Sequence, residues 1–62
     1  MFSFRLIGFI QNSAGFQAVN FLAHDAKEAI KFGKMMLNGH GDYSSYQLEK
    51  ELDNNYILVD SF

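Results

Sequence analysis

The chain has 62 residues, no cysteine and a formal net charge of −2, and 48% of its residues are hydrophobic. This length predicts a single domain, residues 1–62, and the lack of cysteine excludes a disulfide framework. No apolar run approaches the roughly 18 residues of a membrane span and no leader pattern is evident, so we expect a cytoplasmic protein that is not in the membrane.

Two strands are predicted in the first third of the chain, over residues 2–11 and 16–23. Both segments are rich in aromatic and β-branched side chains. Between them, Asn12-Ser13-Ala14-Gly15 is typical of a turn, and Gly15 is suited to a positive φ. With this turn Gln11 opposes Phe16, and the two strands pair antiparallel.

A helix is predicted over residues 26–37, because apolar side chains recur there with a helical period. Asp25 is placed to cap its start, and Glu28 follows three residues later in the capping-box position. The helix is expected to stop at Asn38-Gly39, since Gly39 suits the left-handed conformation that ends many helices.

The remaining residues predict a second hairpin, with strands over residues 44–51 and 56–60 and a turn at 53–55. The order is therefore ββαββ. It predicts an α+β two-layer domain in which a four-stranded, mostly antiparallel sheet carries one helix on one face. The order of the strands across the sheet is left open.

Alternation along the strands divides their side chains between two faces of the sheet. One face of the first hairpin is the more uniformly apolar and is predicted to meet the helix, with Gly8 allowing a close approach. Its members are Phe4, Leu6, Gly8, Ile10, Val19, Phe21 and Ala23. In the second hairpin, Tyr46, Leu48, Ile57 and Val59 are predicted to point inward, and Gln47, Glu49, Glu51, Tyr56, Leu58 and Asp60 outward.

The other face of the first hairpin is also apolar, although a single helix covers only one side of a sheet. An exposed apolar patch of this kind marks an interaction site on a small protein. Aromatic and aliphatic side chains are expected to anchor a partner there, and charged ones to select it. The predicted partner-binding residues are Arg5, Ile7, Phe9, Phe16, Leu22, Glu49, Glu51, Tyr56, Leu58 and Asp60.

The sequence contains no arrangement typical of catalysis, of a metal site or of a cofactor site. His24 and His40 are separated by the predicted helix, and the acidic residues of the second hairpin lie on an open sheet face. We therefore predict a protein that is not an enzyme and binds no cofactor. Base stacking on Phe9 and Phe16 is disfavoured, because five basic residues in a chain of net negative charge do little to neutralise phosphates.

Two alternatives to a protein partner stay open at this point. A homodimer could bury the same sheet face against a second copy. The acidic residues Glu49, Glu51, Asp53 and Asp60 could imitate the phosphates of a nucleic acid, or could simply keep the hairpin solvated.

The segments HDAKEAIKFGKMML and YQLEKELDNNYILVDSF combine a capped helix with an acidic hairpin. In this respect residues 24–62 resemble small proteins encoded by bacteriophages and other mobile elements, anti-CRISPR proteins among them. The resemblance implies a stoichiometric inhibitor or adaptor that occupies the working surface of a host protein. It implies no particular target and carries over no residue role.

Overall fold

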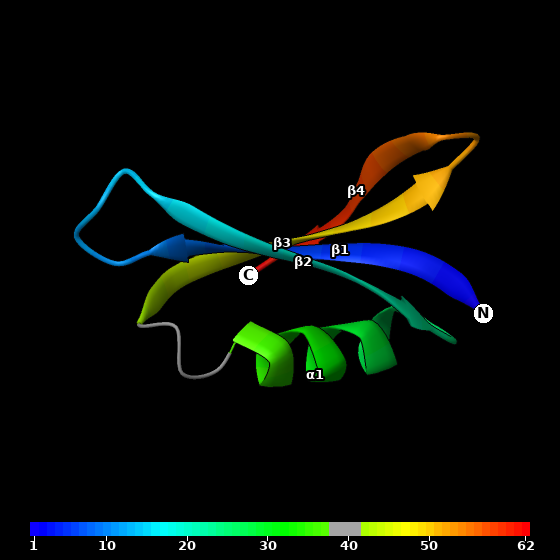
Figure 1. The fold of residues 1–62 in the computed structure, drawn as a ribbon, viewed down its shortest axis with the longest axis horizontal. Coiled ribbons are helices and arrows are strands. Elements are labelled where there is room, and N and C mark those ends of the chain that lie inside the picture. The colour runs from blue at the N-terminus through cyan, green and yellow to red at the C-terminus, as the bar shows by residue number, and fades with distance from the viewer. Residues whose placement is uncertain (38–41) are drawn as a thin grey trace.

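The computed structural model describes residues 1–37 and 42–62 and contains four strands and one helix in the predicted order (Figure 1). The elements are β1 (Phe2–Ile10), β2 (Phe16–Ala23), α1 (Ala26–Leu37), β3 (Tyr43–Leu52) and β4 (Asn55–Ser61). All neighbouring strands are antiparallel, and their order across the sheet is β2-β1-β3-β4. The α+β, two-layer ββαββ architecture is thus confirmed. The expected helix stop at Asn38-Gly39 and the loop residue His40 lie outside the described residues.

The β1–β2 hairpin pairs two residues away from the predicted register. Phe9 pairs with Phe16, and the amide N–H of Ile10 donates to the carbonyl of Gly15 over 3.0 Å. The turn therefore begins one residue earlier than expected, and Asn12, not Gly15, takes the positive φ, at 60°. Because the error in register is an even number of residues, every side chain stays on its predicted face.

The helix packs on the face of the sheet that the alternation pattern selected, as Figure 1 shows. It contacts β2 most, β1 less and β3 least. The buried hydrophobic residues, which form the core between the two layers, are Phe4, Leu6, Ala23, Ala29, Leu37 and Leu48. The rings of Phe4 and Phe21 stack within this layer with their centroids 6.4 Å apart.

Gly33, in the middle of α1, is the residue that brings the helix against the sheet. A Cβ atom at this position would lie 2.8 Å from Cβ of Leu6. The predicted role of Gly8 in this approach is wrong, because Gly8 lies against the ring of Tyr43 at the start of β3. The short distance between the layers therefore depends on a helical glycine, and Gly8 makes room for an aromatic ring.

The predicted cap of α1 is present. The Asp25 carboxylate accepts from the amide N–H of Glu28 over 2.8 Å, and the Glu28 carboxylate accepts from the amide N–H of His24 over 2.9 Å. The Glu28 carboxylate also lies 3.0 Å from Nδ1 of His24. The two contacts of the Glu28 carboxylate with His24 lower the pKa of Glu28 from its ordinary value of 4.5, and the hydrogen bond from the His24 backbone amide has the larger effect.

Replacing Glu28 by glutamine is expected to lower the melting temperature at neutral pH. A carboxyl group whose pKa is lowered in the folded state stabilises the protein above its unfolded pKa and stops doing so as the pH falls through the folded value. The difference from the wild type should therefore shrink on acidification, as measured by thermal unfolding across the acidic range. Glu51→Gln, at an exposed carboxylate on β3, is the matched control. A pH-independent difference for Glu28→Gln would contradict this account.

A bulge changes the expected faces near the end of the second hairpin. Glu49 pairs with Leu58 but Leu48 pairs with Asp60, so Val59 is an extra residue in β4. Asp60 therefore lies on the same side of the sheet as the buried Leu48, and its predicted place on the opposite face is wrong. The alternation pattern could not reveal this, because a one-residue insertion reverses the sides of all residues beyond it.

Within the described residues, no helix is long and apolar enough to cross a membrane.

Candidate functional site

The face of the sheet opposite α1, called the outer face below, carries nine of the ten predicted partner-binding residues; Asp60 is the exception. Its side chains are Ser3, Arg5, Ile7, Phe9, Phe16, Ala18, Asn20, Leu22, Ser45, Gln47, Glu49, Glu51, Tyr56, Leu58 and Ser61. Within residues 1–37 and 42–62, no helix covers this face (Figure 1). The outer face divides into an apolar end, a polar centre and a mixed end.

The apolar end lies next to the β1–β2 turn. Phe9 and Phe16 pair across the two strands with their ring centroids 6.3 Å apart and their planes tilted by 51°. Phe9 is half-buried, whereas Phe16 is 62% exposed. Ile7, opposite Ala18, continues the apolar surface one row further along. This aromatic pair can offer a partner a large contact area from two stiff side chains.

The polar centre is built around Arg5. Its Nε donates to the Glu49 carboxylate over 2.6 Å, and its guanidinium carbon lies 4.1 Å from the centroid of the Tyr56 ring. The Tyr56 hydroxyl in turn accepts from the side-chain amide of Asn20 over 3.0 Å. The expected charged selectors Arg5 and Glu49 are thus paired with each other, and most of their charge is balanced within the protein.

The hydrogen bond between Asn20 and Tyr56 shows that the outer face is concave. These residues belong to β2 and β4, the two edges of the sheet, with β1 and β3 between them. Three strand spacings of about 4.8 Å would hold the edges too far apart in a flat sheet. In Figure 1 the β3–β4 hairpin accordingly rises from the sheet on the side away from α1. The bulge at Val59 contributes to this curvature, because bulges increase the local twist of a strand.

The Arg5–Glu49 pair is expected to stabilise the domain by about 1 kcal/mol, because it is a charged hydrogen bond that is only partly exposed. A double-mutant cycle with Arg5→Ala and Glu49→Ala, followed by urea unfolding, measures this coupling energy. The matched cycle of Arg5→Ala with Glu51→Ala should give a value near zero. Equal coupling energies in the two cycles would contradict the assignment of Glu49 as the partner of Arg5.

The mixed end of the outer face holds Leu22 on β2 and the acidic Glu51 on β3, while Leu58 on β4 pairs with Glu49 and so lies level with Arg5. Leu22 is 59% exposed and Leu58 is 55% exposed. Glu51 is the predicted charged selector that stays exposed on this face. Apolar side chains therefore lie on both sides of the Arg5 cluster.

Sequence reasoning missed a second apolar region, on the side of the sheet that carries the helix. Phe2, Leu52 and Ile57 are all about half-exposed there, and the ammonium group of Lys50 lies 3.8 Å from the centroid of the Phe2 ring. The prediction that Ile57 points inward is correct for its face, but α1 contacts mainly β2 and β1 and leaves it uncovered. The sequence did contain a signal for this exposed region, because it predicts only one helix, and one helix cannot cover all four strands of the sheet.

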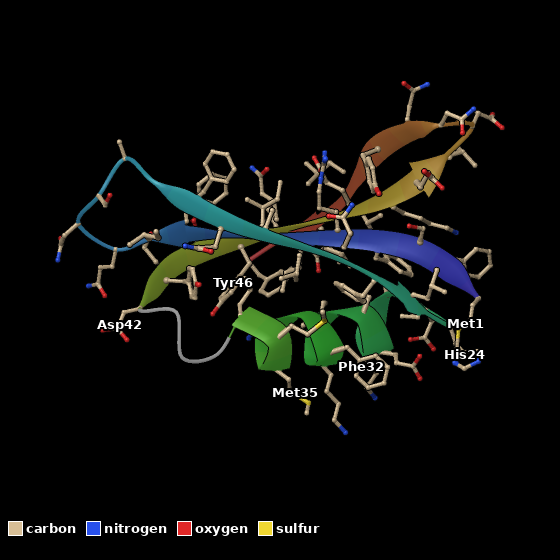
Figure 2. All side chains as sticks on the ribbon, viewed as in Figure 1. Met1, His24, Phe32, Met35, Asp42 and Tyr46 are labelled. Carbon is tan, nitrogen blue, oxygen red and sulfur yellow. The ribbon has the colours of Figure 1, made fainter. Side chains whose placement is uncertain are left out.

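Exposed apolar residues on α1 were also missed. Figure 2 shows Met35 on the side of the helix turned away from the sheet, and Phe32 is also exposed, by 40%. A shallow depression of about 320 Å³ lies beside Phe32 and is otherwise lined by Asp25, Lys27, Glu28 and Lys31. Among the described residues, no group of three or more histidine or acidic side chains could hold a metal ion. The outer face is therefore the best candidate for a functional site.

Comparisons with known protein families, with characterised proteins and with solved structures give no match.

Proposed function

We propose that the chain is a non-enzymatic protein-binding domain that holds a folded partner against its outer face. The observation that carries this proposal is the Phe9–Phe16 pair at one end of the concave face, with Leu22 exposed at the other end and Leu58 exposed on β4 level with Arg5. Binding energy at protein interfaces is concentrated in aromatic anchors that a partner can desolvate fully. Phe16 has this character, and Phe9 supports it from the neighbouring strand.

The polar centre supports the same proposal, because it allows this face to be covered without an unpaired buried charge. Arg5 and Glu49 balance each other's charge, the Arg5 guanidinium lies over the Tyr56 ring, and Asn20 donates to the Tyr56 hydroxyl. A partner that covers them encounters a neutralised cluster, which lowers the desolvation cost. Selectivity then depends on the curvature of the outer face and on its exposed Glu51.

We further propose that binding is inhibitory, with one copy of the chain occluding a working surface of its partner. This narrower proposal rests on the resemblance of residues 24–62 to small proteins of phages and other mobile elements. A homodimer is the competing use of the outer face, and nucleic acid is disfavoured by the net charge of −2.

The test is a side-by-side capture from an extract of the source cells, with the wild type, Phe9→Glu and Met35→Glu as baits. Met35 is on the opposite side of the molecule and is 66% exposed, so Met35→Glu adds the same charge without touching the outer face. A protein retained by the wild type and by Met35→Glu, but not by Phe9→Glu, would support the proposal. Retention that is equal for all three baits would refute it.

A further inference from the structure

The two edges of the sheet differ in how well they are protected against pairing with another strand. Natural sheets protect their edges with charges, prolines and bulges. β4 has both a bulge and the charged Asp60. β2, with the sequence FQAVNFLA, has no charge and no proline, and its register with β1 is regular over all eight residues. β2 therefore lacks each of these three devices.

Every second residue of β2 directs its backbone N–H and C=O groups outward, away from β1. The bond from Ile10 N–H to the Gly15 carbonyl identifies Ile10–Gly15 as a hydrogen-bonded pair of the antiparallel ladder. Pairs then alternate, so the residues that direct their N–H and C=O groups away from β1 are Phe16, Ala18, Asn20 and Leu22. In Figure 1, β2 crosses in front of the other strands, and α1 lies below it.

Apolar side chains flank the β2 edge on both sides of the sheet. On the outer face these are Phe16 and Leu22. On the other side they are Phe32 and Met36 of α1, which precede the buried Gly33 and Leu37 by one residue and so lie about 100° around the helix from them.

The position of Lys34 shows which way this flank of α1 faces. Lys34 follows Gly33 and lies on the opposite flank, where its ammonium group is 5.2 Å from the ring centroids of Tyr46 and Phe62. Tyr46 is on β3, so the Lys34 flank faces the β3 side of the sheet. The Phe32–Met36 flank consequently faces the β2 edge.

We propose that β2 pairs antiparallel with β2 of a second copy of this chain, so that two four-stranded sheets join into one of eight strands. The register that uses the outward backbone groups best places a two-fold axis at Val19. It sets Phe16 opposite Leu22 of the second copy and Ala18 opposite Asn20 of the second copy. No like charges meet along the seam, because β2 carries none. In this register the large apolar side chains of Phe16 and Leu22 lie opposite each other across the seam. This match favours a second copy of the chain over an unrelated strand as the occupant of the edge.

The helix fits the same symmetry axis. Gly33 lies over Leu6, and Leu6 pairs with Val19, so the middle of α1 is level with the axis. With strands about 4.8 Å apart and each helix over β2 and β1, the two helices would lie about 10 Å apart, which is a normal packing distance. Phe32 and Met36 would then meet their counterparts, while Lys34 faces away.

A stable dimer has to bury the area of a standard protein interface. A standard interface buries about 800 Å² per partner, roughly a fifth of the 4217 Å² that this chain exposes. The proposed dimer therefore uses the apolar flanks on both faces as well as the β2 edge itself. The inference goes beyond the proposed function, since Phe9 and the Arg5 cluster remain uncovered in such a dimer.

The test compares matched proline substitutions at the two edges by sedimentation velocity over a wide concentration range. Ala18→Pro removes an N–H that points away from β1 and, in the dimer, one hydrogen bond from each copy. We expect the dimer to weaken roughly tenfold to a hundredfold while circular dichroism shows an intact fold. Leu58→Pro is the control, because Leu58 has the equivalent outward N–H on β4. The Leu58→Pro variant should still form the dimer.

Amide hydrogen exchange provides a second measurement that does not depend on a variant. In the wild type at high concentration, the amides of Ala18 and Asn20 should be protected, and on dilution this protection should be lost while Val19 and Phe21 keep theirs. A wild type that is monomeric up to near-millimolar concentration would overturn the proposal. So would a dimer that survives Ala18→Pro and dissociates with Phe9→Glu, which would place self-association on the outer face.

Discussion

At 25 °C, replacing Leu6 by alanine is expected to leave a large fraction of the protein molecules unfolded. Leu6 is fully buried, at the point where Gly33 brings the helix against the sheet. Removing a buried leucine side chain costs about 2–5 kcal/mol. A chain of 62 residues has a total stability of about 3–9 kcal/mol at typical values per residue, so this one change removes much or all of it.

Urea unfolding followed by circular dichroism measures the effect of Leu6→Ala. Leu58→Ala is the matched control, since it removes the same atoms from a side chain that is 55% exposed, and its cost should stay below about 1 kcal/mol. Similar costs for the two variants would mean that the packing of α1 on β1 contributes little to stability.

The second large effect is expected for Phe9→Glu, which should weaken partner binding by at least 100-fold, a loss of about 2.7 kcal/mol. The substitution removes the ring that supports Phe16 and places a negative charge where the partner is proposed to exclude water. Isothermal titration of the purified chain against a captured partner measures the loss. Met35→Glu should bind as the wild type does.

The fold of Phe9→Glu has to be checked in the same experiment. Phe9 is half-buried on the side of the sheet that α1 does not cover, so we expect the helical and strand signals of circular dichroism to persist. Unfolding of the variant would mean that Phe9 is needed by the domain itself. In that case Phe16→Glu, at a more exposed position of the same pair, separates binding from folding.

The sequence predicted those elements whose pattern is local. The helix over residues 26–37 has the predicted bounds, because the capping residues and the apolar period both act within a few turns. The assignment of Leu6 and Ile7 to opposite faces was also correct, since it depends only on the parity of the β1–β2 pairing. The exact register was not predicted, because either Asn12 or Gly15 could supply the turn conformation.

The features that were not predicted are those that depend on distant parts of the chain. Nothing near Val59 in the sequence indicates a bulge, so Asp60 was placed on the wrong face. Asn20 was not singled out, because its contact with Tyr56 requires both the strand order and the curvature of the sheet. The neutralisation of Arg5 by Glu49 likewise depends on the position of β3 next to β1, and the sequence does not indicate this strand order.

The link between Asn20 and Tyr56 has a mechanical consequence. It ties the first hairpin to the last strand across the outer face, so the curvature of that face is set jointly by residues 36 positions apart. A ligand that wedges the two edges apart would have to break this tie, and the strain would reach β2 and β4 together. The link therefore resists separation of the two edge strands across the outer face.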